Sequence, residues 1–233
     1  MTGTFINVAA ILIGGTIGLI FGARIPERFK NTVITGMGLF TTAMGLQMFL
    51  KSENQLIVLG AIIIGAMLGE WIGIEDWLQA LGQTLEKRFS SDTETGAGSK
   101  FVRGFMVASL LYCIGPMAIL GSIQDGLTGD YNLLAVKSML DGFASIAFAS
   151  TLGVGVMFSS VIILIYQGGI SLLAGQLNAI VTAPMMAEMT ATGGVILMGV
   201  AFNNLLEIKK IRVGNFLPAL AVAPLIVWVL SLL

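Results

Sequence analysis

The chain has 233 residues, of which 56% are hydrophobic and only 11% charged, with a formal net charge of −1. Soluble domains carry about 25% charged residues, so this composition excludes an ordinary soluble domain and indicates a membrane protein, while the near-neutral balance excludes a basic surface for nucleic acid. The chain has no histidine and a single cysteine, Cys113, so it lacks the commonest metal ligand and cannot form an intramolecular disulfide, and we expect neither a metal nor a cofactor.

The first three predicted elements are apolar runs over about 5–22, 32–50 and 55–74. Each is close to the ~20 residues that a helix needs to cross the hydrocarbon core of a bilayer. The first run lacks the positively charged start of a signal peptide, so we expect it to be retained as a span. Inside lipid the backbone must satisfy its own hydrogen bonds, and the predicted fold class is therefore all-α.

A different kind of segment follows, with the sequence IEDWLQALGQTLEKRF over 74–89. Its apolar side chains recur at helical spacing and charged residues fill the other positions, which predicts an amphipathic helix lying in the membrane interface. The next residues, SSDTETGAGSK over 90–100, predict a flexible, solvated loop.

Five more apolar runs complete the chain, over about 101–124, 132–152, 155–175, 186–206 and 213–231. The total is eight crossings, which predicts a polytopic helical membrane protein with a single transmembrane domain over 1–233. We expect this domain to consist of repeat 1 (about 5–74), the interfacial segment (75–100), a central pair of spans (101–152) and repeat 2 (about 155–231).

The two predicted repeats emerge when the sequence is compared with itself at an offset of 154 residues. Over positions 6–70 this comparison gives nine identities, which include Gly14/Gly168, Gly15/Gly169, Gly45/Gly199 and Gly60/Gly214. Apolar, glycine-rich helices also resemble each other through composition alone, which is the alternative explanation. Five crossings precede the second copy, so it would enter the membrane from the opposite face. Such inverted repeats around a central pair are typical of transporters.

Lysine and arginine gather in the loops on one predicted side of the membrane: Arg24, Arg28, Lys30, Lys87, Arg88, Lys100, Lys209, Lys210 and Arg212. The loops on the terminal side carry Lys51 and almost no other basic residue. By the positive-inside rule the basic loops lie in the cytoplasm and both termini lie outside.

The central pair of spans holds the unusual chemistry. Lys137 and Asp141 are four residues apart, hence on one face of the predicted helix, and Asp141 falls near the bilayer centre. An unpaired charge there costs about 2.5–3.5 kcal/mol even on insertion scales, so both should face the protein interior. We interpret the pair, with the hydroxyl of Ser138, as a binding or coupling site. The alternative is a self-compensating ion pair that only fixes helix packing.

Further candidates for the site lie in the fourth and sixth spans. A helix break at Gly115 and Pro116 would expose backbone groups that bind ions, although an ordinary proline kink explains these residues equally well. Gln124 and Asp125 follow in the same span, and Asp125 is expected near the outer interface. Gln167 is a buried polar candidate that could equally be a hydrogen-bonding contact between helices.

The stretches GPMAILGSIQDGL (115–127) and KSMLDGFASIAFASTLGVGV (137–156) resemble the centre of the domain of unknown function 554 family, the YdfK/YqgA-like bacterial inner-membrane proteins. The N-terminal INVAAILIGGTIG, followed by IPERF, resembles the start of the same family. The resemblance covers essentially the whole chain and implies a multi-pass protein of the bacterial inner membrane. It implies no activity.

These observations predict a secondary transporter of a small solute or ion, with Asp141 as the coupling carboxylate. A passive channel is the main alternative, and a membrane scaffold or enzyme is a weaker one. We expect no enzymatic activity, since adjacent helical residues such as Lys137 and Ser138 do not face each other as a catalytic dyad would. The expected partners are the lipid bilayer and a small solute or ion, with no nucleic acid, and a homo-oligomer is left open.

Overall fold

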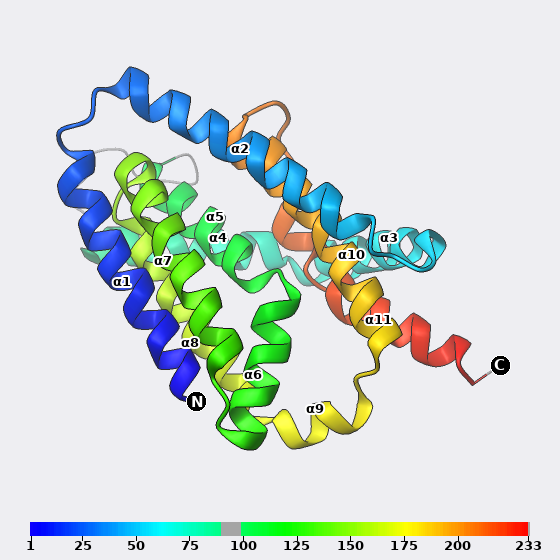
Figure 1. Cartoon of the computed structure of the whole chain (residues 1–233). Coiled ribbons are helices and arrows are strands. Elements are labelled where there is room, and N and C mark those ends of the chain that lie inside the picture. Colours follow the sequence, from blue (N-terminus) through cyan, green and yellow to red (C-terminus); the bar gives the residue numbers. More distant parts are fainter. Residues whose placement is uncertain (90–98, 233) are drawn as a thin grey trace. The chain divides into compact units, whose positions relative to one another are not determined.

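A computed structural model describes residues 1–89 and 99–232, and within these residues every regular element is a helix. The prediction of an all-α fold is confirmed (Figure 1). In chain order the elements are α1 (Thr2–Gly22), α2 (Glu27–Phe49), α3 (Gln55–Ile72), α4 (Ile74–Phe89), α5 (Lys100–Cys113), α6 (Pro116–Thr128), α7 (Asn132–Leu152), α8 (Gly155–Leu172), α9 (Ala174–Ile180), α10 (Ala183–Val200), a π-helix (Ala201–Leu205), a 3-10 helix (Val213–Phe216) and α11 (Ala219–Leu230). Most of the predicted solvated loop lies outside the described residues.

Seven segments of the described chain are long and apolar enough to cross a membrane. They are α1, α2, α3, α7, α8, α10 with its π-helix, and the 3-10 helix with α11. The pair α5 and α6 passes the same test when taken together, with a bend of 63° between the two helices. The chain is therefore a multi-pass membrane protein with seven or eight spans.

The helices group into two compact units, which are described separately. Unit 1 comprises residues 1–36, 79–113 and 117–179, and unit 2 comprises 37–78, 114–116 and 180–233. Unit 1 thus contains α1, α5, α7, α8 and nearly all of α6 and α9, and unit 2 contains α3, α10 and α11, whereas α2 and α4 are divided between the units. The assignment of all spans to one transmembrane domain stays a prediction.

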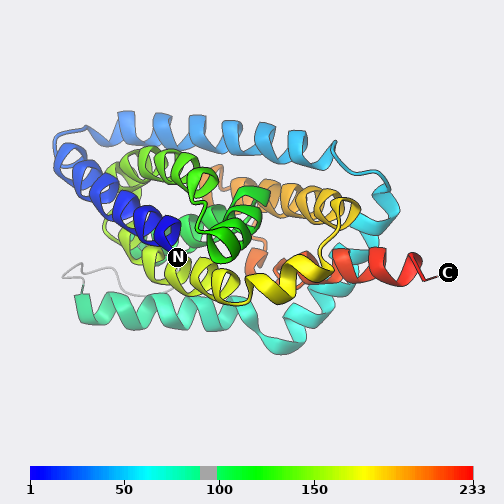
Figure 2. The ribbon, with the colours of Figure 1, turned by 60° about the horizontal axis from the view of Figure 1, so that its bottom comes forward.

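In unit 1 the helices α1 and α7 run parallel and touch through their backbones. A Cβ atom added at Gly14 would lie 2.2 Å from the carbonyl oxygen of Gly142, and one added at Gly22 would lie 2.6 Å from the backbone of Ser150. Figure 1 and Figure 2 both show α1 lying alongside α7. The small residues that recur along α1 therefore create its contact with α7.

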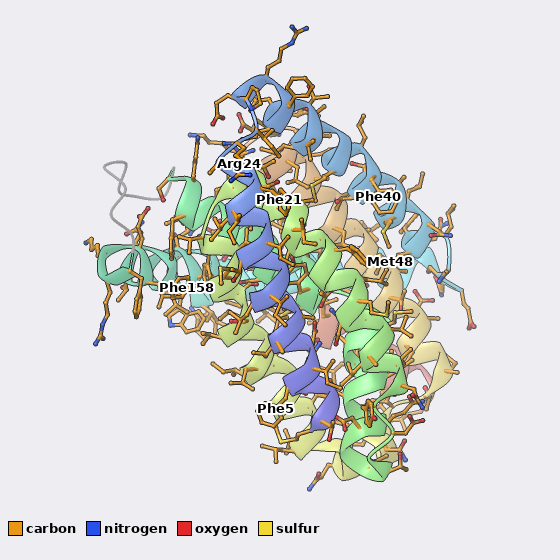
Figure 3. All side chains as sticks on the ribbon, turned by 60° about the vertical axis from the view of Figure 1, so that its left-hand side comes forward. Phe5, Phe21, Arg24, Phe40, Met48 and Phe158 are labelled. Atoms are coloured by element: carbon orange, nitrogen blue, oxygen red, sulfur yellow. The ribbon has the colours of Figure 1, made fainter. Side chains whose placement is uncertain are left out.

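The outer surface of α1 is apolar and its inner surface is small and polar. The side chains of Phe5 and Phe21 are 60% and 59% exposed, and they lie toward opposite ends of the helix (Figure 3). Asn7, by contrast, is fully buried among the glycines of the same helix. This inverted pattern suits a helix whose outer surface contacts lipid.

The bent pair α5–α6 extends along the whole of α8. Near the start of α5, Phe101 packs against Gly155 at the start of α8, and near the end of α6, Gly126 packs against Ser171 at the end of α8. The pair therefore runs from one end of this helix to the other. These contacts indicate one broken crossing rather than a re-entrant loop, which favours the predicted count of eight spans.

The predicted repeats pair up within the units in antiparallel fashion. In unit 1, Gly15 of α1 contacts Met157 at the start of α8, and Gly168 near the end of α8 contacts Met1. In unit 2, Gly65 of α3 contacts Ala219 of α11, two positions that differ by 219 − 65 = 154, the repeat offset.

The pair α2 and α10 in unit 2 follows the same rule. Gly45 packs on Gly194, and Gly38 packs on Leu206, so the two helices also run in opposite directions. The two copies of an inverted repeat must run in opposite directions, as these helices do. The repeat itself stays a prediction.

Several predicted boundaries differ from the structure. The sixth span ends at Leu172 and is followed by the short helix α9, which was not predicted. The eighth span does not begin as an α-helix: it starts with the 3-10 helix, and the α-helix α11 follows only after Pro218. The predicted interfacial segment is confirmed as a helix, α4, and its position in a membrane stays a prediction.

We expect Gly14→Ala to lower the stability of the folded protein, because the added methyl group would lie 2.2 Å from the backbone of α7. Overpacking of this kind typically costs about 1–3 kcal/mol. The matched control is Gly169→Ala on α8, where an added methyl group meets no atom within 4 Å. The measurement is the apparent Tm of the purified protein in detergent. Equal Tm values for the two variants would contradict the close packing of α1 on α7.

Candidate functional site

The predicted ion pair lies inside unit 1, near the middle of α7. The Lys137 ammonium donates a hydrogen bond to Oδ2 of the Asp141 carboxylate, one helical turn away. Lys137 is 6% exposed and Asp141 is 7% exposed, so both charges are removed from the surface. The pair is therefore buried within a span, as the sequence predicts.

Two amide side chains from neighbouring helices extend the pair into a cluster. Nδ2 of Asn7, on α1, lies 3.0 Å from Oδ2 of Asp141 and donates a hydrogen bond to it. The same nitrogen lies 3.3 Å from Oε1 of Gln167, on α8. We call Asn7, Lys137, Asp141 and Gln167 the polar cluster. It joins three spanning helices through the amide nitrogen of Asn7.

The polar cluster retains unused hydrogen-bonding capacity. Asn7 and Gln167 are both fully buried, yet Oδ1 of Asn7 and Nε2 of Gln167 have no hydrogen-bond partner. Buried polar atoms are almost always paired, so such exceptions require an explanation. A small polar molecule or an ion held beside Asp141 would satisfy these atoms.

The helix α5 contributes an aromatic wall to the polar cluster. The Tyr112 ring centroid lies 5.8 Å from Nζ of Lys137, within the range of a cation–π contact. Its hydroxyl oxygen lies 2.8 Å from the hydroxyl oxygen of Ser145 on α7, which fixes the ring orientation. Tyr112 is itself 1% exposed, so it covers the lysine ammonium with a buried ring.

The other predicted site residues lie in different surroundings. Ser138 is buried, but its hydroxyl donates to the carbonyl oxygen of Leu134 at 2.6 Å and so is occupied by its own helix. Gln124 is exposed on α6 and is not brought to the polar cluster. Gly115 and Pro116 form the break between α5 and α6, which groups with unit 2, and their part in a site stays a prediction.

Asp125, which the sequence predicts near the outer interface, is only 3% exposed, so its carboxylate is not free in solvent. Its Oδ2 accepts a hydrogen bond of 2.9 Å from the backbone N–H of Gly3, in the first turn of α1. The first N–H groups of a helix have no partner within the helix, and a carboxylate satisfies them well. Asp125 therefore anchors the start of α1 to α6, a structural role.

Unit 2 contains a second buried carboxylate, Glu188 of α10, which is 2% exposed. It accepts hydrogen bonds from the Ser52 hydroxyl at 2.7 Å and from the backbone N–H groups of Glu53 and Asn54, both at 2.8 Å. Three donors occupy this carboxylate, so it clamps the α2–α3 turn onto α10.

The loop before the 3-10 helix of unit 2 is held by a charge network. Arg212 pairs with Glu70 at the end of α3 and with Asp76 at the start of α4. The hydrogen bond that Arg212 donates to the Asp76 carboxylate raises the pKa of Arg212. Glu75 accepts a hydrogen bond from the backbone N–H of Gly214 at 2.7 Å. This network joins two loops that the sequence predicts to lie on the same side of the membrane.

The chain matches one family model and is similar to two bacterial proteins, one of which is named as a membrane protein. A family model described as "Protein of unknown function (DUF554)" matches residues 2–228. The chain is 30% identical to the "Uncharacterized membrane protein YdfK" of Bacillus subtilis (strain 168), over 99% of this chain and 97% of that protein. It is 31% identical to the "Uncharacterized protein YqgA" of Escherichia coli (strain K12), over 95% of this chain and 94% of that protein. No solved structure matches the chain.

Replacing Lys137 alone should destabilise unit 1. In Lys137→Met the Asp141 carboxylate loses its counter-ion, and breaking a buried pair in this way typically costs about 3–5 kcal/mol. Lys137→Met combined with Asp141→Leu removes both charges, and we expect this double variant to recover at least half of the lost stability. The measurement is again the apparent Tm in detergent, with Lys51→Met as the exposed control. A double variant less stable than Lys137→Met would show that the pair does not act through charge compensation.

Proposed function

The chain belongs to the DUF554 family, and from the geometry of its polar cluster we propose that it is a secondary transporter of a small solute or ion. The single observation that carries this proposal is the buried Lys137–Asp141 pair in the middle of a spanning helix. It is hydrogen-bonded to Asn7, and Asn7 and its partner Gln167, from two other helices, each keep one buried amide atom unpaired. Ionisable residues inside membrane spans commonly mark the path of a substrate or an ion.

A purely structural role explains the polar cluster less well. The cost of removing two charges from water offsets most of what a buried ion pair gains, so such a pair is a poor source of stability. A structural cluster would also be expected to satisfy all of its buried atoms, as Glu188 does in unit 2. The unpaired Asn7 oxygen and Gln167 nitrogen instead favour a ligand.

The pairing of the helices supports a mechanism of alternating access. Each of the three predicted repeat pairs, α1 with α8, α2 with α10 and α3 with α11, is in direct antiparallel contact within one unit. Inverted repeats allow a protein to adopt two related conformations that open one site to either side of the membrane in turn. Two members of the polar cluster, Asn7 and Gln167, lie on the first of these pairs, where such a change would alter access to the cluster.

We also propose that the protein resides in the bacterial inner membrane with both termini outside. Contacts within each unit join helix ends that the predicted topology places on the same side of the membrane. Gly22 meets Ser150, and Phe101 meets Gly155, at helix ends that adjoin the loops on the basic side. On the terminal side, Glu188 binds the turn at 52–54 and Asp125 binds Gly3. The excess of basic residues then assigns the first side to the cytoplasm.

Reconstituted vesicles provide the test of transport. We expect at least one compound of a panel of labelled inorganic ions, amino acids and organic acids to enter with a saturable rate that the same compound on the opposite side stimulates. Asp141→Asn should lower this rate at least about ten-fold, because it removes the negative charge on which the polar cluster is built.

The matched control for the transport assay is Asp130→Asn, an exposed aspartate whose replacement should leave the rate unchanged. Stimulation from the opposite side distinguishes a carrier from a channel. A rate that rises linearly with concentration and shows no such stimulation would indicate a passive channel instead of a carrier. An unchanged rate in Asp141→Asn would remove this carboxylate from the transport site.

The orientation can be tested with reporter proteins fused after Leu233. A C-terminal alkaline phosphatase should be active and a C-terminal green fluorescent protein should be dark, because both ends of the chain are predicted outside. A reporter inserted after Lys87 should give the opposite pattern. Fluorescence from the C-terminal fusion would overturn the proposed orientation.

A further inference from the structure

We infer that the polar cluster is the inner end of a binding site for a small uncharged solute that both donates and accepts hydrogen bonds, such as urea, a simple amide or glycerol. The inference rests on the proposed transport function and names the class of its substrate. Oδ1 of Asn7 can only accept a hydrogen bond and Nε2 of Gln167 can only donate one, and both are buried without a partner among the described residues. A ligand that satisfies both atoms must therefore donate to one and accept from the other.

A simple ion does not meet this requirement. A cation would be attracted by the Asn7 oxygen and repelled by the N–H groups of Gln167, and the reverse holds for an anion. The Lys137 ammonium and the Asp141 carboxylate already compensate each other, so an added ion would also leave a net charge inside a span. An amino acid has donors and acceptors, but its two full charges would have to leave water. An uncharged solute leaves the ion pair as it is.

The contact between the two amides limits the size of the ligand. Nδ2 of Asn7 lies 3.3 Å from Oε1 of Gln167. The unpaired atom of each amide shares a carbon with one of these two atoms, so Oδ1 and Nε2 lie at most about 8 Å apart. Two hydrogen bonds of about 2.9 Å each cover most of that distance. A donor and an acceptor on the same carbon, or on adjacent carbons, are therefore sufficient to bridge the two amides.

Two further hydroxyls extend the site from the polar cluster toward the end of unit 1 at which α1 begins. Thr4 lies one turn before Asn7 on α1, and Ser122 lies on α6. Both side chains are fully buried, and in the described part of the chain neither hydroxyl oxygen has a hydrogen-bond partner. The two helices meet at this level, because Asp125, one turn after Ser122, accepts a hydrogen bond from the N–H of Gly3.

The end of α8 lies at the same level. Ser171, one turn after Gln167, donates a hydrogen bond of 2.9 Å to the carbonyl oxygen of Ser122. Buried serine hydroxyls elsewhere in unit 1, those of Ser138 and Ser159, each donate to a carbonyl oxygen of their own helix. The Ser122 hydroxyl makes no such bond, so it is available to a ligand between α1, α6 and α8.

The unpaired groups of this site lie on one side of the polar cluster. On the other side, the hydroxyl of Ser145 is occupied by Tyr112. The buried side chains that follow in that direction on α1, α7 and α8 are large and apolar, and at most 1% exposed: Ile11, Phe148 and Ile163. A solute therefore reaches the polar cluster from the end of unit 1 at which α1 begins, past Thr4 and Ser122.

The test is counterflow in reconstituted vesicles, with protein-free vesicles to correct for leakage through the bilayer. We expect radiolabelled urea, acetamide or glycerol to accumulate transiently in vesicles that are loaded with the same unlabelled compound. Radiolabelled sodium, chloride and glycine should show no such accumulation, because each brings charge into the span.

Ser122→Ala and Thr4→Val each remove one unpaired hydroxyl. Each should raise the half-saturating concentration of the solute about five-fold, as expected for the loss of one hydrogen bond. The apparent Tm in detergent should stay the same or rise, because a buried group without a partner has been removed. The matched control is Ser159→Ala, a buried serine on α8 whose hydroxyl donates to the Val156 carbonyl oxygen at 2.7 Å, and it should leave the half-saturating concentration unchanged. An unchanged half-saturating concentration in both Ser122→Ala and Thr4→Val would overturn the inference.

The failure of this inference differs from the failure of the proposed function. If sodium, chloride or glycine shows counterflow and none of the uncharged compounds does, the solute class is wrong and the carrier stands. If the uncharged compounds cross at a protein-dependent rate that Ser122→Ala lowers, but without counterflow, the solute class stands and a channel takes the place of the carrier. If no compound, charged or uncharged, crosses at a protein-dependent rate, both proposals are wrong.

Discussion

The structure of unit 1 depends on one constraint, which is that a charge inside a membrane span must be compensated within the protein. The Lys137–Asp141 pair meets this constraint locally, on one face of α7. The remaining capacity of the carboxylate is used by Asn7, which connects α7 to α1, and Asn7 in turn reaches Gln167 on α8. The same atoms that neutralise the charge thus hold three helices together, and packing and chemistry cannot be altered independently here.

The glycine contacts make this arrangement possible. Gly14, Gly18 and Gly22 let the backbone of α1 approach the backbone of α7 along most of its length. At that separation an asparagine side chain on α1 reaches the middle of α7, whereas bulkier residues along the contact would hold the two helices apart. The composition of α1, with large apolar side chains outside and small residues inside, therefore serves both the lipid contact and the site.

Much of this fold follows from the sequence, since the spans have the length of the hydrocarbon core and a lysine–aspartate pair at a spacing of four must share a face. What the sequence could not provide is proximity between distant segments. Asn7 is a single polar residue in the run INVAAILIGG. Its hydrogen bond to Asp141 forms only because α1 packs against α7, and the two residues are 134 positions apart in the sequence. Asp125 and Glu188 show the same limit. Each accepts a backbone N–H from near the start of a different helix, and no local sequence pattern predicts such a contact. The short helix α9 was missed because its seven residues are too few for a clear period.

The contact between α1 and α7 also has a mechanical consequence. Where backbones meet over glycine, few side chains interlock, so one helix can slide along the other without changing rotamers, which is the low-cost form of shear motion. Along α1 the fixed points are Gly3, held by Asp125, and Asn7, held by Asp141, and both lie in the first third of the helix. An α-helix does not stretch along its axis, so α1 can slide on α7 only when both of these hydrogen bonds are released.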